Sequence, residues 1–331
     1  MSGDDRTMGK RLAEAVAFNW YRHPLANLWL LPLHTLFWVV VLLRRVWFAV
    51  FPPAASQVPV IVVGNITVGG TGKTPLIVWL ANRASELGMR IGIVSRGYGG
   101  HSEEYPLTVS SEMSPSVCGD EPWLLHNRLG CPVVVAPRRT QAVERLQGQV
   151  DLILSDDGMQ HYAMPRVAEI LVVDSERGFG NGWLLPIGPL REPKTRLDSV
   201  DCVVENGKDF ILQPLQLVNA LTGEQADLLT LAGKQVHAVA GIGHPARFFS
   251  TLNTLDMTVI EHPFDDHHPF QASDIDYDDD LPVVMTEKDW VKCRDFVTER
   301  YWYLPVDAVP VRKTRYTLDK MLLTWGEKKR G

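Results

Sequence analysis

The 331-residue sequence predicts an α/β fold in which a parallel β-sheet carries helices on both faces and a second, smaller α/β domain follows. Three observations support this prediction. Short apolar, β-branched stretches alternate with helical stretches from residue 58 onward. A glycine-rich loop joins the first such strand to a helix, and a run of 20 uncharged residues precedes them. Together they indicate a P-loop NTPase-like sheet with an N-terminal membrane-associated helix.

Composition excludes several classes of protein. With 45% hydrophobic residues and 22% charged residues, the chain is too apolar for a disordered protein. The four cysteines are widely spaced, which excludes a disulfide scaffold and a thiolate zinc cluster and suits a reducing compartment. A net charge of −6 argues against a nucleic-acid partner. The stretch from residue 15 to residue 85 nevertheless contains no Asp or Glu, so a basic, apolar N-terminus precedes an acidic body.

The uncharged run covers residues 24–43 and is followed by Arg44 and Arg45. As a helix it would be about 30 Å long, the thickness of one hydrocarbon core. Tryptophans within and beside the run favour a membrane interface, and arginines at its end can pair with anionic lipid head groups. Pro32 and His34 interrupt the run and weaken a simple span. Three alternatives remain: a helix on the membrane surface or partly inserted in it, a full span and a buried core helix.

The glycine-rich loop follows a predicted buried strand over residues 58–64 and precedes a predicted helix over residues 75–87. Its glycines let backbone N–H groups face phosphate oxygens, and the helix N-terminus adds positive potential. Lys73 would reach the β- and γ-phosphates, and the Thr74 hydroxyl would bind Mg²⁺. The usual pattern has Gly where this chain has Thr67. The predicted nucleotide-binding residues are Thr67, Gly69, Gly70, Thr71, Gly72, Lys73 and Thr74.

A second strand, over residues 151–154, leads into Asp156 and Asp157. A carboxylate at the end of an apolar strand is the usual Mg²⁺ partner in P-loop enzymes, so we expect one of the pair to hold Mg²⁺ or its water. The alternative is a capped turn.

The remaining strands and helices alternate, as in βαβ units. We expect four segments: a membrane-associated helix over 1–52, a P-loop domain over 53–200, a smaller α/β domain over 201–312, and a C-terminal helix over 313–331 that packs back on the P-loop domain. The Gly- and Pro-rich stretch over 177–196 is long for a connector and predicts a functional loop.

Several polar residues outside the phosphate loop are candidates for the site. Arg96 follows the second strand and could face phosphate, and Arg139 follows another strand and could clamp a second anion. Asp120 could be catalytic or an N-cap. His267 lies in the run Asp265–His268, which could be a metal cluster, an acid–base pair or a solvated loop. The stretch over 286–289 differs from the guanine-reading motif of GTPases, so we do not infer GTP.

These motifs resemble the tetraacyldisaccharide 4'-kinase family, the lipid A 4'-kinases of Gram-negative bacteria. The matching segments are the hydrophobic helix, VGNITVGGTGKTP (63–75), SRGYGG (95–100), GDEP (119–122), SDDGMQH (155–161), FGNGWLLPIGPLRE (179–192), AGIGHPARFF (240–249), Asp266–His267 and VMTEKDWVKC (284–293). They follow the family's order and span most of the chain. Thr67 is the family's own form of the loop.

The resemblance implies ATP-dependent phosphorylation of the 4'-hydroxyl of a tetraacyldisaccharide 1-phosphate, which forms lipid IVA. It implies ATP and Mg²⁺ as cofactors, an anionic lipid surface as partner, and a location on the cytoplasmic face of the inner membrane; we expect a monomer. It also implies that Asp120 is the base, that His267 supports it and that Lys73 acts in catalysis. The implied substrate residues are Arg96, Tyr98, Arg139, Asn181, Arg191 and Glu192.

Two other classes of protein share part of this pattern. A membrane-associated partitioning or maturation ATPase has a similar loop, but its signature lysine is Val68 here. A nucleotide switch without catalysis would need no base at Asp120.

Overall fold

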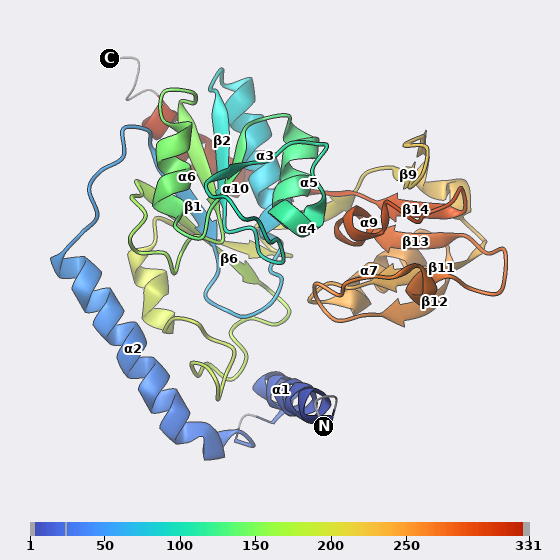
Figure 1. The fold of residues 1–331 in the computed structure, drawn as a ribbon, viewed down its shortest axis with the longest axis horizontal. Helices are drawn as coiled ribbons and strands as arrows, with labels where there is room; N and C mark the ends of the chain where they lie inside the picture. The colour runs from blue at the N-terminus through green and yellow to red at the C-terminus, as the bar shows by residue number, and fades with distance from the viewer. Residues whose placement is uncertain (1–3, 24, 327–331) are drawn as a thin grey trace.

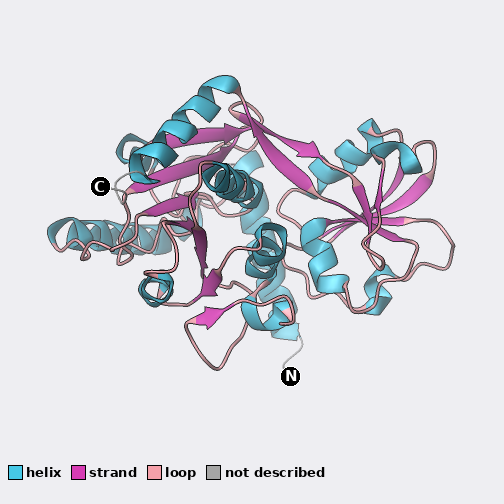
Figure 2. Cartoon of the chain, turned by 90° about the horizontal axis from the view of Figure 1, so that it is seen from above, coloured by secondary structure: helices cyan, strands magenta, loops and turns pink. Residues whose placement is uncertain are grey.

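The computed structural model describes residues 4–23 and 25–326, which form two sheet-containing units side by side, preceded by two N-terminal helices (Figures 1 and 2). The larger unit contains the glycine-rich loop, and the smaller unit lies beside it, at the right in both views. Residues from both units line one cavity, described below.

The N-terminal region contains two helices rather than the one predicted over residues 24–43. They are α1 (Asp4–Arg22) and α2 (Leu31–Val50), with a short 3₁₀ helix η1 (Leu28–Leu30) before α2. Pro24, the first residue of the predicted helix, lies outside the described residues. Pro32 lies in the first turn of α2, where no backbone N–H is needed, and α2 continues through Arg44 because arginine is a good helix former.

Helix α2 is exposed along most of its length. None of its residues is buried, which excludes the buried-core alternative. The segment Leu28–Val50 is long and apolar enough to cross a bilayer by length and composition, and 6% of its most apolar window is buried. Large apolar side chains such as Leu36 and Leu43 are more than 60% exposed. A solvent-exposed apolar surface of this kind indicates contact with another apolar phase.

The larger sheet has nine strands in the order β15-β8-β7-β6-β1-β5-β2-β4-β3. From β7 to β4 the neighbouring strands are parallel, whereas β3 and β15 are antiparallel to their neighbours. The strands are β1 (Val60–Gly64), β2 (Ile91–Ser95), β3 (Leu107–Thr108), β4 (Val133–Val135), β5 (Leu152–Asp156), β6 (Ala168–Asp174), β7 (Cys202–Asn206), β8 (Phe210–Pro214) and β15 (Val306–Pro310).

Helices cover both faces of this sheet, as predicted. Alternate residues of β1 point to opposite faces: Ile61 and Val63 join one buried cluster, and Val60 and Val62 join the other. The first cluster includes side chains of α3 (Lys73–Glu86), α5 (Asp120–Leu129) and α10 (Arg312–Gly326), and the second includes α6 (Arg139–Leu146). The short elements α4 (Pro115–Cys118) and η2 (Lys194–Ser199) complete this unit.

The smaller unit is built on a second sheet with the strand order β10-β9-β14-β13-β11-β12. Its strands are β9 (Leu217–Asn219), β10 (Gln225–Ala226), β11 (Gln235–Ala240), β12 (Thr258–Pro263), β13 (Val283–Thr286) and β14 (Tyr301–Leu304). Its helices are η3 (Leu228–Leu231), α7 (Pro245–Thr254), α8 (Ala272–Ile275) and α9 (Glu287–Cys293). Helix α7 packs on one face of the sheet, and α8 and α9 pack on the other.

The boundary predicted at residue 200 is wrong. Strand β7 pairs in parallel with β6, and β15 pairs with β8, so all three strands that flank the smaller unit belong to the larger sheet. The smaller unit is therefore an insertion between β8 and β15, which meet at the pair Pro214–Val306. An apolar β-branched pattern marks a strand but not its partner, so the sequence did not show on which sheet these strands lie. Helix α10 returns to the larger unit, where Leu318 and Leu322 are buried.

Candidate active site

The glycine-rich loop connects β1 to α3 and is shaped by two left-handed glycines. Gly69 has φ +97° and Gly72 has φ +87°, conformations that side chains with a Cβ rarely adopt. A Cβ at Gly72 would lie 2.6 Å from Nδ2 of Asn206. Asn206 Nδ2 donates to the Thr71 carbonyl at 3.3 Å, and Asn65 Nδ2 donates to the Gly69 carbonyl at 3.2 Å. Asparagines on β7 and after β1 therefore hold the loop from two sides.

The long loop between β6 and η2 packs against the glycine-rich loop. The Val68 amide donates to the Pro189 carbonyl at 2.9 Å, and the Arg191 amide donates to the Ile66 carbonyl at 2.7 Å. Arg177 donates to the Gly70 carbonyl and, at 3.3 Å, to the Gly243 carbonyl of the smaller unit. The stretch over 177–196 is thus part of the site's framework.

Asp156 and Asp157 lie beside the glycine-rich loop, because β5 pairs with β1 at Asp156–Val63. Lys73 Nζ is 3.5 Å from Asp157 Oδ1, and Arg191 binds both Asp157 oxygens at 3.0 and 3.1 Å. Burial alone would raise the pKa of Asp157, but Lys73 and Arg191 hold it well below its usual range. Burial, and next the charge of Glu121, raise the pKa of Asp156 to about 7. The two neighbouring carboxyls therefore differ strongly in their affinity for a proton.

A second polar cluster forms where the two units meet. His267, in the loop after β12, has Nδ1 3.6 Å from Oδ2 of Asp120, the first residue of α5. Lys288 Nζ donates to His267 Nε2 at 3.2 Å and pairs with Glu121 Oε1 at 3.2 Å. Because an ammonium can only donate, Nε2 accepts, and the ring proton lies on Nδ1, toward Asp120. The Tyr98 ring packs edge-on against His267, with centroids 4.7 Å apart.

One cavity of about 1000 Å³ joins the two clusters. Most of the predicted site residues line it: Gly69, Gly70, Thr71, Gly72, Lys73, Thr74, Arg96, Tyr98, Arg139, Asp156, Asp157, Arg191 and His267. Asp120 touches this group through His267. Thr67 is buried under the loop, where its Oγ1 accepts from Asn65 Nδ2 at 3.4 Å.

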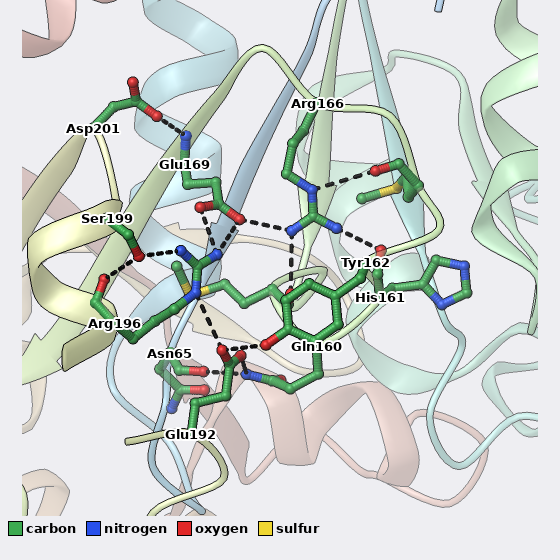
Figure 3. A network of polar contacts seen from close by, with 12 residues as sticks. Asn65, Gln160, His161, Tyr162, Arg166, Glu169, Glu192, Arg196, Ser199 and Asp201 are labelled. Carbon is green, nitrogen blue, oxygen red and sulfur yellow. Dashed lines mark hydrogen bonds and ion pairs between the residues drawn. The ribbon is translucent and has the colours of Figure 1, made fainter. Parts of the chain in front are cut away.

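Two predicted substrate residues, Asn181 and Glu192, do not line the cavity. The expectation that Glu192 lines the cleft is therefore wrong. Glu192 is 1% exposed and accepts from Gln160 Nε2 at 2.8 Å and Tyr162 Oη at 2.5 Å, while Arg196 Nε lies 3.1 Å away (Figure 3). Asn181 does not line the cavity either: its Nδ2 donates to the Ile187 carbonyl at 2.9 Å. The sequence motif placed both residues near the site but did not show the direction of their side chains.

Other residues at the cavity were not identified from the sequence. Lys288, Asn206 and Arg44 line the cavity, and Arg177 lies beside it, where it donates to the Gly243 carbonyl at 3.3 Å. Lys288, Arg177 and Asn206 each lie at or just after the carboxyl end of a strand, which is the signal that could have found them. Arg44 carries no such signal, because it lies within the apolar helix α2.

Comparison with known proteins gives a consistent result. A family model described as tetraacyldisaccharide-1-P 4'-kinase matches residues 26–324. Proteins named tetraacyldisaccharide 4'-kinase are 49% identical in Hahella chejuensis (87% of this chain and 90% of that protein) and 52% identical in Alkalilimnicola ehrlichii (80% and 82%). A solved structure of LpxK from Aquifex aeolicus in complex with ATP has a TM-score of 0.75 at 26% identity and covers 88% of this chain and 98% of that one. With its glycine-rich loop and its cavity between two sheet-containing units, the chain belongs to the tetraacyldisaccharide 4'-kinase family.

Proposed function

We propose that the chain transfers the γ-phosphate of ATP to the 4'-hydroxyl of a tetraacyldisaccharide 1-phosphate, forming lipid IVA. Family membership makes the chain a lipid A 4'-kinase. The observation that carries the proposed chemistry is the meeting of the Lys73 loop and the Asp120–His267 pair at one cavity. Phosphoryl transfer needs little covalent chemistry, so a site that positions the two reactants and neutralises charge supplies most of the catalysis.

The glycine-rich loop would bind the triphosphate. The backbone N–H groups of residues 69–72 and the N-terminus of α3 offer positive potential, and Lys73 adds a full charge. Asp157 holds Lys73 at 3.5 Å, so the ammonium is fixed beside the loop before the nucleotide enters. Arg191 in turn fixes Asp157 through two hydrogen bonds.

Thr74, Asp156 and Asp157 fit a magnesium ion. They offer hard oxygen ligands at the mouth of the loop, and Oδ1 of the buried Asp156 has no hydrogen-bond partner among the described residues. A cation beside this carboxyl would favour its ionised form. When bound, Mg²⁺ would neutralise charge on the phosphate oxygens. The few protein ligands match the usual magnesium site, in which substrate phosphates and water complete the shell.

Asp120 would accept the proton of the sugar hydroxyl as that hydroxyl attacks the γ-phosphorus in line. His267 would orient the Asp120 carboxylate through its Nδ1–H, because Lys288 occupies Nε2. The 3.6 Å separation is longer than a hydrogen bond, and catalytic contacts of this kind often shorten when substrates bind. Asp120 and His267 come from different units, so a change in the spacing of the units would change the pair.

Helix α2 would lie on the cytoplasmic face of the inner membrane. The helix contacts the larger unit along its length, through His34, Phe37, Arg44 and Phe48. Contacts of this extent favour a helix that lies at the membrane interface over one that spans the bilayer. Most of its remaining apolar side chains are exposed and free to enter the lipid. We expect the chain to act there as a monomer.

The position of transfer tests this proposal. Purified protein is incubated in detergent micelles with radiolabelled ATP, Mg²⁺ and either the disaccharide 1-phosphate or the same acceptor with its 4'-hydroxyl blocked. Label should enter only the unblocked acceptor. Label in the blocked acceptor, or in neither, would refute the proposed reaction.

A further inference from the structure

Arg44 belongs to the apolar helix α2 and yet lines the catalytic cavity. Its Nη2 donates to the Gln160 carbonyl at 3.3 Å, and its guanidinium lies 5.8 Å from the centre of the Tyr162 ring. The next residue, Arg45, does not line this cavity; it lines a separate groove of about 420 Å³ beside Tyr162 and Arg166. Two adjacent arginines of one helix therefore face two different spaces.

Most cations of the cavity are already paired with carboxylates. The pairs are Lys73 and Arg191 with Asp157, Lys288 with Glu121 and Asp266, Arg128 with Glu287 and Asp307, and Arg247 with Asp174 and Glu176. Among the side chains that the structure describes, no carboxylate lies within 4.0 Å of Arg44 or Arg96. Arg44 and Arg96 thus keep their charge available to a ligand.

The surroundings of His161 place these arginines in one region. His161 lines the same cavity, and burial together with the charges of Arg139, Arg166, Arg44 and Arg96 lowers the pKa of its imidazole to about 4. Arg44, Arg96 and Arg139 line the cavity together with His161, and the charges of these guanidinium groups act on its neutral imidazole. Such a concentration of positive charge in a partly desolvated site favours an anion.

A series of hydrogen bonds fixes Arg44 relative to the glycine-rich loop. Arg44 donates to the Gln160 carbonyl, and Gln160 Nε2 donates to the Asn65 carbonyl at 3.0 Å. Asn65 begins the loop, and its carbonyl also accepts from Arg191 at 3.2 Å. The exposed Arg44 guanidinium is therefore a second cationic point linked to the loop, on the side of the cavity where the apolar helix lies.

We propose that Arg44, together with Arg96, binds the phosphate monoester that the lipid acceptor carries on the sugar opposite the reacting hydroxyl. This inference rests on the proposed function, in which the acceptor is a disaccharide 1-phosphate. A guanidinium matches a phosphate with two parallel hydrogen bonds, and its position on α2 places this contact next to the surface that would hold the acyl chains. Arg44 thereby selects acceptors that already carry the phosphate.

The test compares two acceptors, the disaccharide 1-phosphate and its dephosphorylated analogue, in neutral detergent micelles. Wild-type protein should prefer the phosphorylated acceptor by about 10- to 100-fold in kcat/KM, as expected for one charge-assisted contact. Arg44→Gln should abolish most of this preference by raising the KM for the phosphorylated acceptor, and Arg44→Lys should keep part of it. The KM for ATP should change by less than about twofold in every variant. Arg45→Gln removes the same charge from the same helix and should retain the preference.

The other outcomes are equally decisive. If Arg44→Gln weakens both acceptors equally, or if wild-type protein has no preference, the inference is wrong. If the effect of Arg44→Gln appears only on vesicles of anionic phospholipid and not in neutral micelles, Arg44 binds lipid head groups instead, and the inference is again wrong. If wild-type protein phosphorylates neither acceptor, the proposed function itself fails.

Discussion

Asp120 and His267 lie with Oδ2 and Nδ1 3.6 Å apart, although they belong to different units of the protein. Asp120 begins α5 in the larger unit, and His267 has φ +62° in a loop of the smaller unit. Lys288 contacts the opposite ring nitrogen, so the imidazole is held in one tautomer. This arrangement supports our proposal that Asp120 is the general base.

Replacing Asp120 by Asn should lower kcat by about 10²- to 10⁴-fold, because an amide cannot accept the hydroxyl proton. The KM for ATP should remain within about twofold, since Asp120 touches His267 and not the glycine-rich loop. Steady-state kinetics with the lipid acceptor measure both constants. Unchanged turnover would eliminate Asp120 as the base.

Replacing Glu192 by Ala should destabilise the protein more than it affects catalysis. The change removes a partner of both Arg196 and Tyr162 inside the buried network of Figure 3. We expect the free energy of unfolding to fall by about 3–5 kcal/mol, because a buried charge then loses its partner. Denaturant unfolding measures this loss, and Glu192→Gln, which keeps the shape, should lose less. A fully stable Glu192→Ala protein with a raised KM for the acceptor would instead return Glu192 to the substrate site.

The stability of the protein should depend on pH through His161. The pKa of His161 is about 4 in the folded chain, against an ordinary value near 6.5. Between pH 4 and pH 6.5 the unfolded chain binds a proton at His161 that the folded chain does not bind. The contribution of the neutral imidazole to the free energy of unfolding is therefore fully present above pH 6.5 and is lost as the pH falls toward 4. Thermal unfolding of His161→Gln should therefore show a smaller drop in Tm from pH 7.5 to pH 5 than wild type. Equal drops would contradict the assignment.

Charged substitutions on α2 should release the protein from lipid. Leu36→Glu and Leu43→Glu each place a carboxylate on an exposed apolar surface that we expect to enter the membrane. Flotation with anionic vesicles should recover less of these variants than of wild type. Leu229→Glu is the matched control, because Leu229 is 64% exposed on the smaller unit. Equal flotation of all four proteins would argue against α2 as the membrane contact.

The sequence predicted most of the fold and the site because their determinants are local. The strand–loop–helix around Lys73 runs from Val60 to Glu86 and the strand ending at Asp156 begins at Leu152, so each is encoded in one short continuous segment and lies where the pattern placed it. Features that depend on partners far along the chain were not predicted. Tertiary packing, which a local pattern does not encode, sets three such features. They are the pairing of β7 with β6, the inward direction of Glu192 and the approach of Arg44 to the cavity.

Transfer of label from radiolabelled ATP to the disaccharide 1-phosphate, compared between wild type and Lys73→Ala, tests the account most directly. Lys73 lies beside the glycine-rich loop and is held by Asp157, so its loss should remove charge neutralisation at the γ-phosphate. We predict labelled lipid from the wild type and a rate at least about 10²-fold lower from Lys73→Ala. No labelled lipid from the wild type, or equal rates from both proteins, would contradict the account.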